Sequence, residues 1–186
     1  MNTNIHNPIF LLGMTRRSGT NFLMRLLALH PDLAPTDFSY EDYMLSEAHW
    51  LHHYVHRVYK RWNPSWEVDP SRETLLFQSL GQGLIDCLTA FCDGKRLVTK
   101  TPSVENLPYF FDLFPNAYLL ILIRDGRDVV ESMVRSFRRA YEEATRIWVR
   151  AGRTIVDFDK ANCEKGLKYL MVRYEDLVLD LDSQLE

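Results

Sequence analysis

The chain has 186 residues, of which 46% are hydrophobic and 25% are charged. This balance is typical of one globular domain with a sizeable core and unlike a disordered or fibrous chain. The formal net charge of −3 favours neither a nucleic-acid partner nor a membrane surface, so any anion site has to come from locally placed cations. The densest apolar run, at 118–123, is too short to span a bilayer. The three cysteines form no CxxC pair, which argues against a disulfide framework or a structural zinc site and favours the cytoplasm as compartment.

The predicted elements alternate between strands and helices along the chain. A buried strand at 8–12 ends in Gly13, and helical spacing follows over 19–30. The later predicted elements are helices at 39–62 and 72–92, a strand at 96–99, a helix opening near Ser103, a strand at 117–123, a turn at 124–126 followed by a helix, a helix at about 141–162, a strand at 169–173 and a helix from Glu175. This order predicts one α/β domain over 1–186 with a three-layer P-loop-like fold, in which helices cover both faces of a central parallel sheet.

The loop GMTRRSGT at 13–20 lies between the first strand and the first helix, where backbone N–H groups at a helix N-terminus commonly hold phosphate. Gly19 lets the backbone approach an oxyanion, Ser18 and Thr20 add hydroxyl donors, and Arg17 adds a fixed positive charge. The loop that binds nucleoside triphosphates places Lys directly before its metal-binding hydroxyl, whereas here the cations precede the Ser-Gly-Thr triplet. The pattern therefore favours a metal-free anion site. The alternative is a helix capped by Ser18 with solvated arginines, although cations in a first turn oppose the helix dipole.

A second candidate anion site follows the strand at 117–123. Arg124 stands at the carboxyl end of this strand, and Ser132 lies about two turns into the next helix. A guanidinium fork and a hydroxyl would converge on one phosphate if the helix passes beside it. The alternative is that Arg124 pairs with a carboxylate and Ser132 is an ordinary helix residue.

Four blocks in chain order, PIFLLGMTRRSGTNFLMRLLALHPD, VTKTP, LILIRDGRDVVESM and VRYEDLV, resemble the sulfotransferase family that uses 3'-phosphoadenosine 5'-phosphosulfate (PAPS), in particular its bacterial and Golgi-like branches. The resemblance covers nearly the whole chain. It implies transfer of a sulfuryl group from PAPS to a hydroxyl or amine acceptor, with no metal required. It further implies that these residues bind the donor: Arg16, Arg17, Ser18, Gly19, Thr20 and Asn21 at the 5'-phosphosulfate, Arg124 and Ser132 at the 3'-phosphate, and Tyr174 at the nucleotide end.

The resemblance also implies three catalytic residues. Arg17 and Lys100 would stabilise the charge that develops during transfer, and a carboxylate would act as the general base. Glu41 is the first candidate for the base, with Asp37 and Asp42 behind it. The alternative is that Glu41 and Asp42 are ordinary acids in the first turn of a helix capped by Ser39, where acids favour the helix dipole.

The chain departs from the family pattern at three positions. Asn21 replaces a frequent second Thr, which keeps the hydrogen-bonding capacity. Three residues separate Gly13 from Arg17 where the family usually has two, so it stays open whether Arg16 or Arg17 faces the leaving group. Pro102 stands where the cytosolic branch commonly has a histidine that follows Lys-Thr. The base is therefore expected elsewhere.

Several alternatives stay open from the sequence. The chain could be a P-loop nucleotide kinase or nucleoside-triphosphate hydrolase, or a non-catalytic adenine-nucleotide-binding protein. Four histidines at 49, 52, 53 and 56 form two i, i+4 pairs, but without a third ligand they favour a solvated or acceptor-lining helix face over a metal site. The acceptor, whether a small molecule, a saccharide or another group, and the oligomeric state are not determined. The chain is either a compact member or a fragment that lacks a C-terminal lid.

Overall fold

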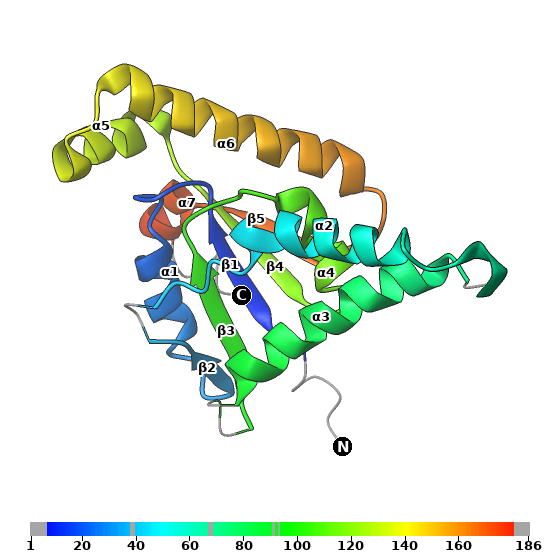
Figure 1. Cartoon of the computed structure of the whole chain (residues 1–186). Coiled ribbons are helices and arrows are strands. Elements are labelled where there is room, and N and C mark those ends of the chain that lie inside the picture. The colour runs from blue at the N-terminus through cyan, green and yellow to red at the C-terminus, as the bar shows by residue number, and fades with distance from the viewer. Residues whose placement is uncertain (1–6, 38–39, 67–68, 91, 93, 181–186) are drawn as a thin grey trace.

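The computed structural model describes residues 7–37, 40–66, 69–90, 92 and 94–180. Within this part of the chain, five parallel strands form one sheet in the order β2-β3-β1-β4-β5. The strands are β1 (Ile9–Gly13), β2 (Leu33–Pro35), β3 (Arg96–Thr101), β4 (Tyr118–Ile123) and β5 (Tyr169–Arg173). The helices are α1 (Thr20–Leu27), α2 (Ala48–Tyr59), α3 (Ser71–Thr89), α4 (Phe110–Leu113), α5 (Gly126–Phe137), α6 (Tyr141–Asn162) and α7 (Tyr174–Leu179). The predicted parallel sheet with helices on both faces is confirmed (Figure 1).

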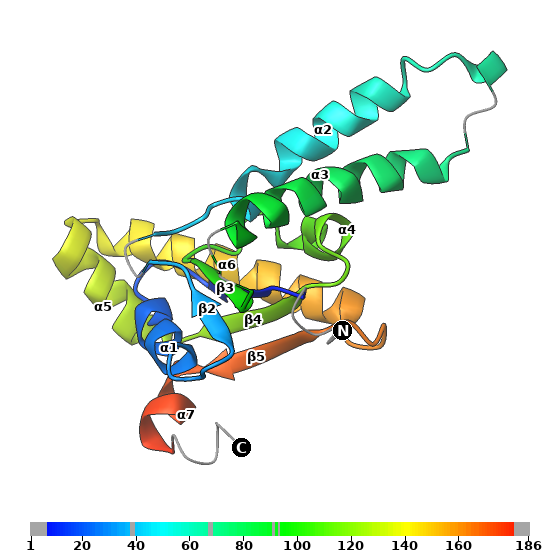
Figure 2. The same cartoon turned by 90° about the horizontal axis from the view of Figure 1, so that it is seen from below.

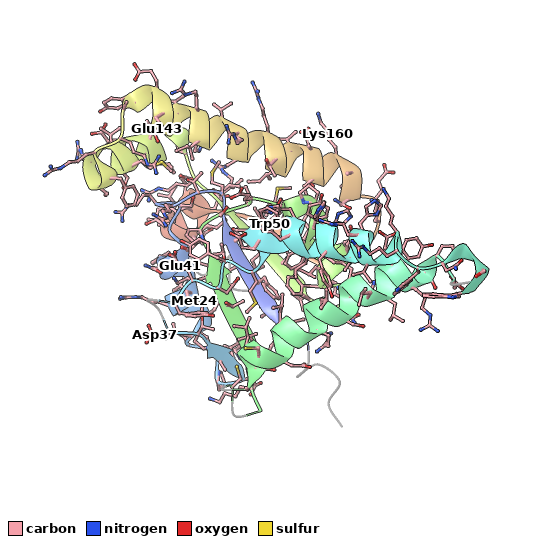
Figure 3. The ribbon with its side chains drawn as sticks, viewed as in Figure 1. Met24, Asp37, Glu41, Trp50, Glu143 and Lys160 are labelled. Carbon is pink, nitrogen blue, oxygen red and sulfur yellow. The ribbon has the colours of Figure 1, made fainter. Side chains whose placement is uncertain are left out.

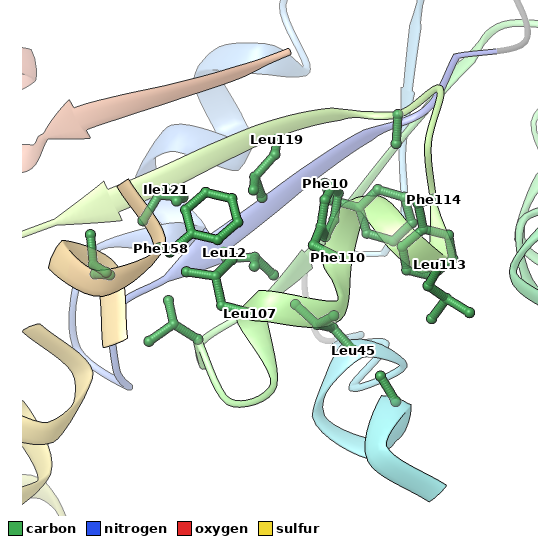
Figure 4. Packing of buried hydrophobic residues seen from close by; sticks show 14 of the residues in the cluster. Phe10, Leu12, Leu45, Leu107, Phe110, Leu113, Phe114, Leu119, Ile121 and Phe158 are labelled. Atoms are coloured by element: carbon green, nitrogen blue, oxygen red, sulfur yellow. The ribbon is translucent and has the colours of Figure 1, made fainter. Parts of the chain in front are cut away.

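Successive side chains of β1 point to opposite faces of the sheet, and this alternation separates two cores. Phe10 and Leu12 are buried on the face covered by α3, α4 and α6, where Phe10 stacks on Phe114 with ring centroids 4.6 Å apart (Figure 4). Leu11 is buried on the other face, with Met24 of α1 and with α7 nearby (Figure 2). The continuous apolar runs of the inner strands therefore reflect burial on both faces.

The α2–α3 pair forms a helical arm beside this sheet. The two helices pack on each other, and Figure 2 shows that they extend past the edge of the sheet. Phe77 and Ile85 of α3 are buried in the core, whereas Trp50 of α2 is 62% exposed (Figure 3). No helix among the described residues is long and apolar enough to cross a membrane.

Residues 40–43, which precede the short 3₁₀ helix Leu45–Glu47 and α2, are not helical, and the predicted helix from 39 is wrong in its first part. Residues 40–43 run beside β3 without helical structure. The N–H of Asp42 donates to the carbonyl of Lys100 at 3.2 Å, and the N–H of Tyr43 donates to Oγ1 of Thr101 at 3.1 Å. These hydrogen bonds to β3 compete with helix formation and hold the segment at the carboxyl edge of the sheet.

The side chain of Asp42 explains why this segment turns inward. Its carboxylate accepts a hydrogen bond from Oγ1 of Thr99 at 2.6 Å and another from the N–H of Met44 at 2.9 Å. Burial raises the pKa of Asp42 above its usual value, because the charged form loses solvation. Asp42 is thus a structural acid, and Glu41 is not a first-turn helix residue. Ser39, the expected cap, lies outside the described residues.

Candidate functional site

The carboxyl ends of the parallel strands bring the predicted site residues to one edge of the sheet. The phosphate-type loop follows β1, Lys100 lies near the end of β3, Arg124 follows β4 directly, and Tyr174 follows β5 directly. Glu41 lies in the segment between β2 and α2 (Figure 3). Ligands of open α/β sheets bind at this edge, so the topology alone gathers residues that are far apart in the sequence.

The loop between β1 and α1 is tightened by two left-handed residues. Arg17 has a φ of 74° and Gly19 a φ of 97°. The hydroxyl of Ser18 is buried inside the loop, where it donates to the carbonyl of Thr15 at 2.7 Å and accepts from the N–H of Thr15 at 3.1 Å. A direct hydroxyl contact between Ser18 and an anion, the predicted role, would require breaking these bonds. In this geometry Ser18 shapes the loop.

The N-terminus of α1 lacks the usual internal partners. Gly19 is the cap residue, no side-chain cap hydrogen bond is present, and no acidic residue lies in the first turn. The first N–H groups of a helix need outside acceptors, and here Arg16 and Arg17 precede them. This end of α1 has the backbone donors, the positive dipole and the flanking cations that an anion requires.

Gly19 also packs directly against Tyr174. A Cβ atom at Gly19 would lie 2.4 Å from Cδ2 of the Tyr174 ring, well inside van der Waals contact. Phe22 packs against the same ring in an edge-on arrangement, with centroids 5.8 Å apart. Tyr174 thus supports the loop from the end of β5, while its predicted contact with the nucleotide stays a prediction.

We expect Gly19→Ala to lower the free energy of unfolding by roughly 1–3 kcal/mol, because it adds backbone strain and a clash with Tyr174. Chemical denaturation measures this loss. Gly166→Ala is the matched control, since Gly166 has a φ of 65° and a Cβ atom at this position would meet no atom within 4 Å. Equal losses for the two variants would show that packing on Tyr174 contributes nothing.

Arg124 is held in place by the loop and by Tyr174. Its Nη1 donates to the carbonyl of Arg17 at 3.2 Å, and its guanidinium carbon lies 4.3 Å from the centre of the Tyr174 ring. The Nη2 atom is 3.7 Å from Oδ2 of Asp128, which is longer than a hydrogen bond. Its Nε is buried and has no hydrogen-bond partner among the described residues. The ion pair between Arg124 and Asp128 is therefore loose. The Arg124 guanidinium keeps N–H donors that can bind another acceptor.

Ser132 reaches the same loop from α5. Its hydroxyl accepts a hydrogen bond from Nε of Arg17 at 2.9 Å. Arg124 and Ser132, which are predicted to meet at one phosphate, are thus joined through Arg17. Arg124 donates to the backbone carbonyl of Arg17, and Ser132 accepts from the side chain of Arg17. The two predicted anion sites form one connected cluster.

The N-terminus of α5 is satisfied by its own residues, in contrast to α1. Asp125 caps the helix by accepting from the N–H of Arg127 at 2.8 Å, and the Arg127 side chain lowers the pKa of Asp125 to about 2. Glu175 accepts from the N–H of Asp125 at 2.8 Å, and Nε1 of Trp148 donates to the carbonyl of Arg124 at 3.2 Å. These contacts fix the turn that orients Arg124.

One cavity joins six of the nine predicted donor-binding residues, and Ser18, Ser132 and Tyr174 do not belong to its lining. This loop cavity, of about 400 Å³, is lined by Arg16, Arg17, Gly19, Thr20, Asn21, Glu41, Pro102, Arg124 and Phe137. Arg17 and Arg124 open onto the same space, as binding of both phosphates of one nucleotide requires. Lys100 does not belong to this lining and is 1% exposed.

Lys100 approaches the loop cavity through Glu41. Its Nζ lies 3.7 Å from Oε1 of Glu41. The other oxygen of Glu41 accepts a hydrogen bond from the hydroxyl of Tyr43, and this hydroxyl accepts from Nη2 of Arg16 at 3.1 Å. The predicted acid and two of the predicted cations therefore belong to one polar network, with Tyr43 at its centre.

A second, larger cavity lies next to the first. This helix cavity, of about 510 Å³, shares Arg16, Pro102 and Phe137 with the loop cavity. Its remaining lining comes from the β1 loop, the segment before α2, the loop after β3, and helices α5 and α6. Apolar and polar side chains are mixed in it, with Met14, Val104, Met133 and Ile147 beside Tyr43, Ser46, Asn106 and Thr154. An acceptor in this space would lie beside the predicted base.

The four histidines of α2 do not form a metal centre in the described part of the chain. His56 pairs with Glu73 at 2.8 Å, His49 lies 3.1 Å from the amide of Asn106, and His52 stacks on Tyr109. The described residues contain no group of three or more His, Cys, Asp or Glu side chains placed to hold a metal. These rings serve packing and hydrogen bonding.

Sequence reasoning missed three residues that shape the site. These residues are Tyr43, Phe137 and Trp148. The helical spacing predicts Tyr43 to be one of several aromatic residues on a helix, and nothing in the sequence around Phe137 or Trp148 indicates a contact outside their own helices. Arg16 lies over the Phe137 ring, 5.9 Å from its centre, and a Cβ atom at Gly126 would lie 2.8 Å from Trp148. No local spacing signals these contacts, because each joins separate elements.

Comparison with characterised proteins identifies relatives of this chain. The chain is 26% identical over 192 residues to protein-tyrosine sulfotransferase A of Caenorhabditis elegans, covering 96% of this chain and 48% of that protein. It is 25% identical to the protein-tyrosine sulfotransferase of Drosophila melanogaster, covering 92% of this chain and 35% of that protein. The chain thus spans about half, or less, of the length of these relatives.

Solved structures share the fold. The sulfotransferase domain of the Synechococcus PCC 7002 olefin synthase matches with a TM-score of 0.59 and 24% identity, over 96% of this chain and 70% of that one. A sulfotransferase from Mycobacterium tuberculosis matches with a TM-score of 0.57 and 17% identity, over 96% of this chain and 65% of that one. The sequence model of the sulfotransferase family matches residues 8–186. The chain therefore belongs to the sulfotransferase family.

Proposed function

We propose that this chain transfers a sulfuryl group from PAPS to a hydroxyl or amine acceptor. The observation that carries the proposal is that the uncapped N-terminus of α1, Arg17 and Arg124 face one cavity. A nucleotide with phosphates on both its 5' and 3' sides needs two groups of donors at a fixed separation. The loop around Gly19 suits the 5' side, and Arg124 with Ser132 suits the 3'-phosphate.

The donor set fits this ligand without a metal. Guanidinium groups and backbone N–H groups bind phosphate and sulfate oxygens directly. The buried Nε of Arg124, which has no hydrogen-bond partner among the described residues, fits an arginine that completes its bonding with an anion. Bound PAPS supplies the sulfuryl group and a phosphate leaving group.

Glu41 is the residue that we propose as general base. It lines the loop cavity, and Tyr43, to which it is hydrogen-bonded, lines the helix cavity. The proton of the acceptor hydroxyl passes to Glu41 as the acceptor oxygen forms its bond to sulfur. The bond from sulfur to the bridging oxygen breaks, and the leaving phosphate takes the negative charge. Arg16, Arg17 and Lys100 provide the positive charge that stabilises this distribution.

The helix cavity is the acceptor site in this proposal, because it meets the loop cavity at Arg16, Pro102 and Phe137. The relatives in Caenorhabditis elegans and Drosophila melanogaster are named for sulfation of protein tyrosine. A phenolic hydroxyl is therefore the first acceptor to test, ahead of saccharide hydroxyls and amines. The cysteines at 87 and 163 are exposed and form no disulfide within the described part of the chain, which suits a reducing compartment such as the cytoplasm.

The direct test is mass spectrometry of acceptors incubated with the protein and PAPS. The acceptor set contains a simple phenol, a tyrosine peptide, a saccharide and an amine. We expect one acceptor to gain a single SO₃ group in the presence of a metal chelator, with none gained when PAPS is replaced by 3'-phosphoadenosine 5'-phosphate (PAP). Tight binding of PAP without transfer to any acceptor would instead favour a non-catalytic nucleotide-binding protein.

A further inference from the structure

Tyr43 lies where the two cavities meet. It lines the helix cavity, and its two hydrogen-bond partners Arg16 and Glu41 line the loop cavity. Its hydroxyl donates to Oε2 of Glu41 and accepts from Nη2 of Arg16 at 3.1 Å. One phenol group thus joins the proposed base to the loop that follows β1.

The backbone of Tyr43 is held in an uncommon conformation. Its φ of 51° lies in the left-handed region, which residues other than glycine, asparagine and aspartate adopt rarely and at a cost. The N–H of Tyr43 donates to Oγ1 of Thr101 at the end of β3, and the neighbouring Asp42 is anchored to Thr99 of the same strand. The surrounding structure therefore fixes the point from which the phenol extends.

The same network restricts Glu41 on both sides. Lys100 lies 3.7 Å from Oε1, and Tyr43 holds Oε2. Two oxygens of a carboxylate offer about four acceptor positions, so capacity for an incoming hydroxyl is left. A carboxylate side chain that is about 30% exposed would otherwise sample several rotamers.

We propose that Tyr43 is a positioning residue that holds the Glu41 carboxylate at the junction of the two cavities. This inference rests on the proposed function. Glu41 must be close to the acceptor hydroxyl when the bond to sulfur forms, and small displacements of a base are costly to catalysis. Arg16 in turn donates a hydrogen bond to the Tyr43 hydroxyl. This one hydroxyl group therefore aligns two parts of the site: the β1–α1 loop, which holds the sulfuryl donor, and the base Glu41.

The test compares Tyr43→Phe with the wild type and uses Glu41→Gln as the second arm of a double-mutant cycle. We expect Tyr43→Phe to lower kcat roughly 10- to 100-fold, the loss typical of one hydrogen bond to a charged group. The KM of the acceptor and the Kd of PAP should change by less than about twofold, because the phenyl ring still fills its place. The variant that combines both changes should be no slower than Glu41→Gln alone, since the hydroxyl acts through Glu41.

Two controls keep these outcomes apart. Tyr54→Phe removes a hydroxyl from α2, at a tyrosine that is 58% exposed, and should leave kcat unchanged. Thermal unfolding of each variant checks that Tyr43→Phe is folded. An unchanged kcat in Tyr43→Phe, or losses that multiply in the combined variant, would overturn the positioning role while the proposed function stands. A wild-type protein that binds PAP and transfers nothing would overturn the proposed function and this inference with it.

Discussion

Replacing Glu41 with glutamine is expected to lower kcat roughly 100- to 10,000-fold, the range usually contributed by a general base. Glutamine keeps the shape of the side chain and its hydrogen bond with Tyr43, but it cannot accept the acceptor proton at neutral pH. The Kd of PAP should change by less than about twofold, because nucleotide binding depends on other groups. Single-turnover transfer and calorimetric titration of PAP measure the two quantities separately.

Asp37→Asn is the matched control for this experiment. Asp37 lies on the same segment and is exposed, and it is an alternative candidate for the base from the sequence (Figure 3). We expect this variant to retain wild-type turnover. If Asp37→Asn lost turnover while Glu41→Gln kept full activity, Asp37 would be the general base instead of Glu41.

Replacing Arg124 with alanine is expected to weaken PAP binding roughly 10- to 100-fold, as loss of a hydrogen-bonded charge contact usually does. Adenosine 5'-phosphate lacks the 3'-phosphate, so its affinity should change by less than about threefold in the same variant. The ratio of the two affinities therefore isolates the 3'-phosphate contact. Calorimetry in the presence of a chelator measures both ligands under identical conditions.

Arg127→Ala provides the comparison for Arg124→Ala. The Arg127 side chain is 91% exposed and pairs with Asp125 away from the loop cavity. Its removal should leave both affinities nearly unchanged. If Arg124→Ala weakened the binding of both nucleotides equally, Arg124 would stabilise the loop through its hydrogen bond to the carbonyl of Arg17 and would not contact the 3'-phosphate.

The parallel sheet, and the edge of the sheet at which the site residues lie, could be predicted because the sequence patterns that indicate them are local. The apolar run that forms β4 and the glycine-containing loop before α1 each mark a strand end followed by a helix start. In a parallel sheet these ends lie together, so Gly19 and Arg124 could be placed on one edge without knowledge of the strand order. The predicted bounds of α6 and β5, 141–162 and 169–173, are those of the structure.

The surroundings of Glu41 could not be predicted, since distant residues determine them. The aromatics around 40–54 follow helical spacing, yet residues 40–43 are drawn to β3 by bonds that join Asp42 to Thr99, 57 positions away. The short strand β2 was missed for a similar reason, because Leu33–Pro35 is extended only through its pairing with β3. The role of Tyr43 follows from this misassigned segment.

The loop also shows why motif spacing was insufficient to assign the two arginines. Arg17 takes a left-handed conformation and turns its Nε to Ser132, while Arg16 turns to Tyr43 and Glu41. The arginine next to the proposed base is therefore Arg16, and Arg17 is the one that contacts Ser132. Only the backbone geometry separates the two side chains.

We propose that the loop cavity holds both phosphates of a single adenosine nucleotide without a metal. Calorimetric titration of the wild-type protein with PAP, adenosine 5'-phosphate and ATP, with a chelator and then with Mg²⁺, tests it most directly. We expect PAP to bind at least roughly tenfold more tightly than adenosine 5'-phosphate, because it gains a charged phosphate contact, and we expect Mg²⁺ to leave this preference unchanged. Equal affinity for the two nucleotides, together with tight binding of ATP only when Mg²⁺ is present, would contradict it.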